Sequence, residues 1–228
     1  MPNGLGTPAL LLALVDGRFP AGGYAHSGGL EPAVTSGHVQ TVDDLEPFLL
    51  GRLRTTGLVT AAVAAAACRE VLGGTTIERL AALDSELDAR TPSPAQRATS
   101  RQLGRQLVRA VVTITPQLAG METGHRAPHL PVALGVAFGH HGLSPYDAAL
   151  ACLHESAAGV VAAAVRVLST DPFVTYGVLA RLAPVIDELA GEAVDRSADL
   201  ADLPADSGPL QDTNAERHLT RATRLFAS

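Results

Sequence analysis

The chain has 228 residues, of which 46% are hydrophobic, and its formal net charge is −6. This length and apolar content suffice for one sizeable core and favour a single domain over 1–228. The acidic balance gives no support for nucleic-acid binding, which usually requires a basic patch. All 17 basic residues are arginine, so the chain has no lysine of its own for a Walker A phosphate loop, a Schiff base or a protein-kinase active site.

Five segments along the chain begin with the same kind of helix-start signal. Each has a Ser or Thr at the capping position, followed by a proline at the first helical position or by an acidic or amide residue three positions on. The capping residues are Thr7, Thr41, Thr75, Ser93 and Ser144.

Glycines follow several of these segments, as a left-handed C-terminal cap requires, at Gly37, Gly73–Gly74 and Gly142. Between the start and stop signals, apolar residues recur mostly at spacings of three and four, which is typical of amphipathic helices. The predicted helices cover 8–16, 28–36, 43–56, 58–72, 76–90, 94–114, 130–141, 145–169 and 173–194, with a last short helix over 213–224.

Strand signals are sparse, because aromatic residues make up only 4% of the chain and no hairpin turn sequence separates alternating runs. The polar segment 197–209 is predicted to be a loop, which leaves 210–228 as a C-terminal tail. The sequence therefore predicts an all-α fold, a single-domain helical bundle of about nine or ten helices.

The apolar segments do not resemble export or membrane signals. Pro8–Val15 lacks the preceding basic residues of a signal peptide and is too short to cross a bilayer. The longer run Ala148–Val165 contains a histidine and a glutamate, which argues against a membrane span. Cys68 and Cys152 lie in alanine-rich runs without CxxC spacing, as expected for buried thiols in a reducing cytoplasm. We therefore expect a cytoplasmic protein that does not associate with a membrane.

The glycine-rich segment 19–31 contains four glycines, and Tyr24, Ser27, Leu30 and Glu31 lie among them. Such a segment could hold a phosphate at the start of the following helix, or present Ser27 as the nucleophile of a small hydrolase. No lysine follows it, and its proline and glycines would not form the strand that a nucleophile elbow needs. A tight connection between two helices is the favoured interpretation, with no catalytic residue and no cofactor.

The histidines do not form a convincing metal site. His125 and His129 have helical metal-pair spacing, but Gly124 and Pro128 disfavour a regular helix there. The adjacent His140 and His141 would diverge by about 100° on a helix. Without a third ligand in register, the sequence predicts no metal bound within one chain.

The C-terminal tail ends in two large apolar residues, Leu225 and Phe226, with Arg221 and Arg224 beside them. Chain ends are usually polar and frayed, so this composition suggests docking. The tail could pack on its own core, or it could order against a partner, since apolar anchors beside arginine are typical of interface hot spots.

Four stretches of the chain follow the pattern of one known family. They are 19–37 with its Ser-Gly-Gly-Leu-Glu core, 98–107, 129–135 leading into the alanine-rich segment that reaches Arg166, and the tail residues 217–218 and 224–228. Their order and spacing resemble the UreF-type urease accessory proteins over nearly the whole chain.

This resemblance implies an all-helical homodimer without catalytic activity. It implies binding to a second accessory protein of the UreD or UreH type, and joint recruitment of the nickel-carrying UreG-type GTPase. The assembly would dock on apo-urease and couple GTP hydrolysis to nickel delivery. The absence of lysine fits this division of labour, because the phosphate loop then belongs to the GTPase.

The resemblance also suggests which residues contact partners. Five of them would shape a helix junction near an interface: Tyr24, Ser27, Gly28, Leu30 and Glu31. Five more would dock onto the UreD-type protein: Arg217, His218, Arg224, Leu225 and Phe226.

The chain departs from the family pattern at two places. It has Ser169–Pro172 where the family has a Gly-Gln turn, and Ala227 where an arginine is common. The main alternative function is a nickel-binding metallochaperone that uses His125, His129, His140 or His141.

Overall fold

The structure is a computed structural model that describes residues 8–17, 19–20, 22–74, 77–118, 127–221 and 224–227. Within these residues every regular element is a helix, so the predicted all-α fold is confirmed. The α-helices are α1 (Pro8–Leu14), α2 (Leu30–Thr35), α3 (Leu45–Arg52), α4 (Leu58–Leu72), α5 (Ile77–Arg90), α6 (Pro94–Ile114), α7 (Leu130–His140), α8 (Pro145–Val167), α9 (Pro172–Asp195) and α10 (Pro209–Leu219). Short 3₁₀ turns lie at Gly23–Ala25, Val42–Asp44, Pro116–Leu118 and Leu200–Asp202, and a π-helical segment covers Leu53–Gly57.

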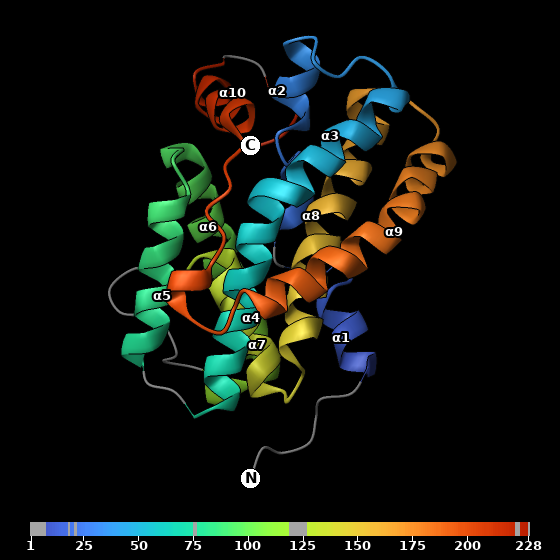
Figure 1. The fold of residues 1–228 in the computed structure, drawn as a ribbon. Coiled ribbons are helices and arrows are strands. Elements are labelled where there is room, and N and C mark those ends of the chain that lie inside the picture. Colours follow the sequence, from blue (N-terminus) through green and yellow to red (C-terminus); the bar gives the residue numbers. More distant parts are fainter. Residues whose placement is uncertain are drawn as a thin grey trace.

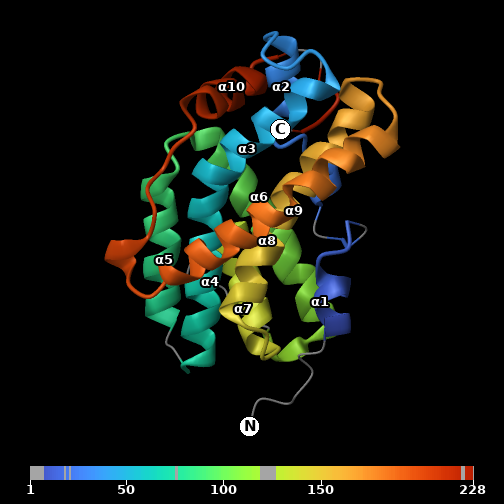
Figure 2. The same cartoon turned by 45° about the vertical axis from the view of Figure 1, so that its right-hand side comes forward.

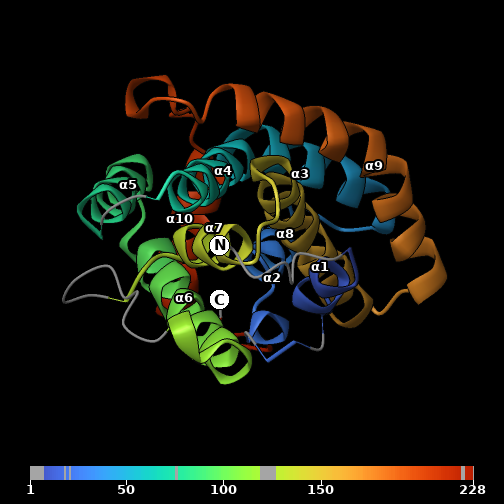
Figure 3. The ribbon, with the colours of Figure 1, turned by 90° about the horizontal axis from the view of Figure 1, so that it is seen from below.

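The bundle is arranged around α7, which packs against α4, α6 and α8 (Figure 3). Helix α5 covers α4 from outside, and α9 crosses the outer face of α3, α4 and α8 (Figure 1). Helices α2 and α10 lie side by side at one end of the bundle, where the chain also ends (Figure 2). This end therefore brings the glycine-rich segment and the C-terminal tail together.

Helices α4 and α7 form the most extensive helix–helix contact in the described bundle. Every residue of Ala61–Cys68 is buried, and the small side chains let α7 approach the α4 backbone. A Cβ atom at Gly135 would lie 2.2 Å from the carbonyl oxygen of Ala64, closer than atoms can approach. The central contact thus depends on glycine on one side and alanine on the other.

Most of the predicted start and stop signals are confirmed. The hydroxyls of Ser93 and Ser144 accept the N–H of the third residue of α6 and α8, at 3.2 and 3.1 Å. Thr41 donates its N–H to the Asp44 carboxylate at 2.9 Å, at the start of a 3₁₀ turn. The stop glycines Gly37, Gly74 and Gly142 all have positive φ, while Thr7 and Thr75 lie outside the described residues.

The predicted break between 56 and 58 does not occur. The chain stays helical from Val42 to Leu72, passing through the π-helical segment. The hydroxyl of Thr55 donates to the Gly51 carbonyl at 2.8 Å, and Thr60 bonds the Gly57 carbonyl at 2.9 Å. These threonines satisfy backbone carbonyls within the helix, so the local Gly and Thr residues widen the helix without ending it.

The C-terminal helix is also placed differently from the prediction. Helix α10 begins at Pro209, because proline is well suited to a first helical position, and ends at Leu219. Residues 224–227 are not helical. The tail beyond α10 is thus available to turn back onto the bundle.

Two segments, Val42–Leu72 and Pro145–Val167, are long and apolar enough to cross a membrane. Within their most apolar stretches, 61% and 50% of the residues are buried inside the fold. The core helix of a soluble protein has the same length, composition and burial, so these segments are weak evidence for a membrane span.

Candidate partner-binding site

The site begins at the glycine-rich junction that leads into α2. Gly28 and Gly29 both adopt left-handed backbone angles, with φ of +61° and +86°. A Cβ atom at Gly28 would lie 2.7 Å from Cγ2 of Val160, so only glycine fits there without rearrangement. The buried Ser27 hydroxyl accepts the N–H of Glu31 at 3.3 Å, which closes the first turn of α2. The junction therefore holds Glu31 in one orientation.

The carboxylate of Glu31 fixes the C-terminal tail. It accepts the N–H of Leu225 at 2.8 Å and the N–H of Phe226 at 3.0 Å. One residue later, Ala227 donates its N–H to the Ala25 carbonyl at 2.8 Å. Hydrogen bonds to an ionised carboxylate are stronger than those between neutral groups, so this residue of α2 clamps the end of the chain.

Phe226 is the anchor of the tail, because its side chain is only 6% exposed and joins the main core. The guanidinium of Arg166, at the end of α8, lies 4.8 Å from the ring centroid in a cation–π contact. His218 of α10 is buried beside it, with Nε2 3.3 Å from the Phe226 carbonyl and 4.0 Å from the Glu31 carboxylate. Three helices therefore converge on the tail.

The outer side of this cluster is exposed and combines apolar and basic groups. Tyr24 is 75% exposed and Leu225 is 61% exposed, and they lie one and two residues along the chain from the hydrogen-bonded Ala25 and Ala227. Arg217 and Arg224 are exposed as well, and neither has a carboxylate within 4.0 Å in the described part of the chain. The exposed side chains of the segments that meet here are thus two large apolar ones and two basic ones.

The structure brings the two predicted sets of site residues together, but it divides them by burial. Ser27, Leu30, Glu31, His218 and Phe226 are buried and hold the tail on this chain. Those available to another molecule are Tyr24, Arg217, Arg224 and Leu225. Sequence reasoning missed Arg166 and Arg52, because a single arginine on a helix is indistinguishable from an ordinary surface charge.

A second polar cluster joins α5, α6 and the start of α7. Arg101 donates to Asp84 at 2.7 Å and to Asp88 at 2.6 Å. The other oxygens of these carboxylates accept the backbone N–H of His129 at 2.8 Å and interact with its Nε2 at 2.9 Å. Asp84, Asp88 and His129 could together hold a metal ion, but each already bonds within the cluster. The arrangement is that of a structural ion-pair network.

The pKa values in this cluster follow from burial and these bonds. Burial lowers the pKa of His129 below its usual value, and the bond with Asp88 offsets this only in part. Burial would raise the pKa of Asp88, but hydrogen bonds from His129 and Arg101 outweigh it, and the net pKa is lowered. The folded cluster thus favours a neutral imidazole beside an ionised carboxylate.

The other described histidines do not assemble into a metal site. His140 and His141 stand edge to face with ring centroids 5.6 Å apart, and Nε2 of the buried His141 lies 3.1 Å from the Thr115 hydroxyl. His125 lies outside the described residues. Burial raises the pKa of the Cys68 and Cys152 thiols to about 12 and about 11, so neither forms a thiolate near neutral pH.

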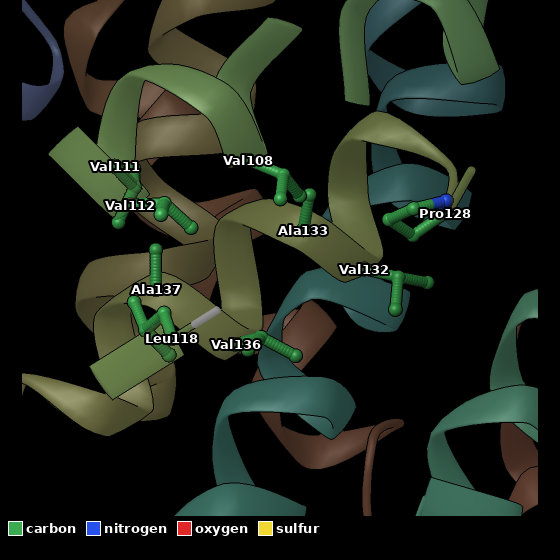
Figure 4. A pocket seen from close by; sticks show the side chains of 9 residues that line it. All are labelled: Val108, Val111, Val112, Leu118, Pro128, Val132, Ala133, Val136 and Ala137. Atoms are coloured by element: carbon green, nitrogen blue, oxygen red, sulfur yellow. The ribbon is translucent and has the colours of Figure 1, made fainter. Parts of the chain in front are cut away.

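The apolar pocket between α6 and α7 offers no chemistry. Valine, leucine, alanine and proline side chains line it, among them Val108, Val112 and Val136 (Figure 4). No titratable or hydrogen-bonding side chain in the described part of the chain reaches it. Catalysis by this pocket therefore has no support.

Comparison with known proteins places this chain in one family. The UreF family model matches residues 39–183. Three similar proteins carry the name urease accessory protein UreF. The relative from Mycobacterium sp. (strain JLS) is 44% identical over 97% of this chain and 99% of its own length. The relative from Mycolicibacterium vanbaalenii is 45% identical over 96% of this chain and 98% of its own length. The relative from Mycobacterium tuberculosis H37Rv is 40% identical over 96% of this chain and 98% of its own length. The chain therefore belongs to the UreF family of urease accessory proteins, which take part in urease maturation.

Proposed function

We propose that this chain is a non-enzymatic scaffold of urease maturation. With a UreD/UreH-type protein it recruits the UreG-type GTPase and supports nickel delivery to apo-urease. The scaffold acts as a homodimer in the cytoplasm. The observation that carries the proposal is the docked tail, which exposes Leu225 near the glycine-rich junction that carries the exposed Tyr24. Arg217 and Arg224 are exposed on the same segments and form no ion pair among the described residues.

The composition of this surface supports contact with a protein partner. Interface hot spots are enriched in tyrosine and arginine, and a rigid anchor costs less conformational entropy on binding than a free tail. The Glu31 clamp holds the backbone of Leu225 before any partner arrives. Tyr24 and Leu225 would thus provide the apolar contact, and Arg217 and Arg224 would pair with acidic groups of the UreD/UreH-type protein.

The proposal is tested by substituting Leu225→Asp and measuring binding to the UreD/UreH-type protein. A buried apolar contact would be replaced by an unpaired charge, so we expect the affinity to fall at least tenfold, or by about 1.4 kcal/mol. The matched control is Leu72→Asp, since Leu72 is 48% exposed and ends α4 at the opposite end of the bundle (Figure 1). Equal binding by both variants would count against the tail surface.

The alternative is direct nickel binding by histidines of this chain. Its best support is the grouping of Asp84, Asp88 and His129. Against it, Arg101 bonds both carboxylates, so a positive charge already occupies groups that would have to bind the cation. Equilibrium dialysis of the isolated chain with Ni²⁺ separates the two functions, since tight stoichiometric binding that His129→Gln abolishes would favour the chaperone.

A further inference from the structure

Arg52 makes an unusual set of contacts for a half-buried cation. It is the last residue of α3, directly before the π-helical segment. Its Nη1 donates to the carbonyl of Gly28 at 2.9 Å, and its Nε donates to the hydroxyl of Ser156 on α8 at 3.0 Å. No carboxylate of the described residues lies within 4.0 Å of it, so both bonded acceptors are neutral.

Holding a guanidinium in such surroundings is costly. Burial lowers the pKa of Arg52, which reflects the loss of hydration that an ion pair would normally offset. Neutral acceptors recover only part of that loss. We therefore ask which of the two acceptors depends on Arg52, and the Gly28 carbonyl is the one that lacks another donor.

The Gly28 carbonyl has no other donor among the bonds of this junction. The first N–H groups of α2 are already used, because Leu30 bonds the Ser27 carbonyl and Glu31 bonds the Ser27 hydroxyl. Pro32 has no N–H, and the N–H of Ala33 bonds the Gly29 carbonyl. A carbonyl left without a partner inside a protein costs about 1–3 kcal/mol, and Arg52 supplies the missing donor.

The same contact ties the junction to the helix that supports the tail. Helix α8 carries Ser156, which orients Arg52. It also carries Val160, whose side chain occupies the space that a side chain at position 28 would need. Its last turn carries Arg166, which covers the ring of Phe226. Three residues after Gly28, Glu31 receives the tail amides. The position of Glu31 relative to α8 thus depends on the Gly28 turn.

We propose that Arg52 is a positioning residue for the tail. By holding the Gly28 carbonyl against α3 and α8, it fixes the left-handed turn and sets Glu31 where it receives the N–H groups of Leu225 and Phe226. Arg52 bonds Gly28 and Ser156, so it acts on the tail through the junction. Its effect on partner binding rests on the proposed function, whereas its effect on the tail does not.

The test compares Arg52→Met with Arg54→Met in the full chain by amide hydrogen exchange. Methionine keeps much of the apolar stem but removes all donors, and Arg54 is an exposed arginine two residues away. For Arg52→Met we expect at least tenfold faster exchange at Leu225 and Phe226, faster trypsin cleavage after Arg224, and unchanged exchange in 61–67 of α4. Arg54→Met should match the unsubstituted chain at all these amides.

Two further variants keep the test decisive if Arg52→Met does not fold. Arg52→Lys keeps a charged donor group but lacks the planar fork that reaches two separate acceptors, and Ser156→Ala removes only the group that orients Nε. We expect both variants to speed amide exchange at Leu225 and Phe226, but by less than Arg52→Met does. If Arg52→Met does not fold, both should still exchange measurably faster at these amides than the unsubstituted chain. Unchanged exchange at Leu225 and Phe226 in every folded Arg52 variant would overturn the proposal, as would equal acceleration in the tail and α4.

The exchange and cleavage measurements need no partner protein. Combined with a separate binding measurement, they distinguish a failure of the proposed function from a failure of the role assigned to Arg52. Loss of tail protection with unchanged binding of the UreD/UreH-type protein would leave Arg52 as the positioning residue and refute the partner role of the tail. Unchanged protection with lost binding of that protein would refute the role of Arg52.

Discussion

Individual residues in rare backbone conformations show where the chain carries strain. Among the described residues, Ser169 is the only non-glycine with a positive φ, at 51°. It lies just after α8, between that helix and α9. The left-handed region costs an L-residue roughly 1–2 kcal/mol, and glycine avoids that cost.

Ser169→Gly should therefore stabilise the chain. Because glycine also gains freedom in the unfolded chain, the net gain in unfolding free energy should be about 0.5–1 kcal/mol. Urea denaturation of the two proteins measures this difference. A loss of stability would mean that the serine side chain provides a contact worth more than the strain.

His129 should make stability depend on pH. Burial lowers its pKa in the folded chain, whereas the pKa of a histidine in the unfolded chain is about 6.5. The unfolded chain then binds the proton more tightly, so the neutral imidazole contributes stability above that value. This contribution is lost as the pH falls from about 6.5 through the lowered folded pKa.

Urea denaturation between pH 7.5 and 5 should show a steeper loss for the natural chain than for His129→Gln. His26 and His141, whose pKa values are also lowered by burial, are present in both proteins and cancel in the comparison. Asp88 loses its charge only at more acidic pH, since its pKa is lowered. Parallel curves would contradict the role assigned to His129.

The contact between helices α4 and α7 sets the stability of the core. Gly135→Ala would push a methyl group to within 2.2 Å of the Ala64 carbonyl oxygen, so the helices must separate. Overpacking of this kind typically costs about 1–3 kcal/mol.

Gly159 on α8 is the matched control, because nothing lies within 4 Å of its Cβ position. Gly159→Ala should raise stability by about 0.5–1 kcal/mol through helix propensity alone. Thermal unfolding followed by circular dichroism gives both values. Equal effects of the two substitutions would show that close packing at Gly135 does not limit the core.

Local signals predicted most elements, because capping and termination depend on neighbouring residues. Ser93, Ser144 and the stop glycines are examples, since their bonds span only a few positions. The π-helical segment was missed because its Gly and Thr residues favour a break locally, while the surrounding core keeps the helix continuous. The start of α10 was placed too late because Pro209 follows a polar, loop-like segment.

The candidate site was harder to predict, since its bonds join opposite ends of the chain. The sequence indicated both the glycine-rich segment and the tail, but nothing local connects Glu31 to amides 194 and 195 positions away. Nothing in the sequence indicated the contacts of Arg52 and Arg166 with the junction and the tail, because these contacts arise only when α3 and α8 bring the two arginines there.

At the scale of the whole molecule, the bundle forms a platform for its own C-terminus. Residues from α2, α8 and α10 converge on Phe226, and the exposed residues around this cluster include Leu225, Tyr24 and two arginines that form no ion pair in the described part of the chain. If this face recruits the maturation partners, its loss should abolish assembly and leave the bundle helical, since Phe226 is the only residue of the described segment 224–227 that belongs to the core.

The most direct measurement is co-expression with the cognate UreD/UreH-type protein and the UreG-type GTPase, with complex masses read by light scattering on a sizing column. We expect the full chain to enter a stable complex that holds two copies of it. We expect a chain truncated after residue 223 to remain helical and elute without partners. A full-length chain that elutes alone, or a truncated chain that assembles normally, would contradict the account.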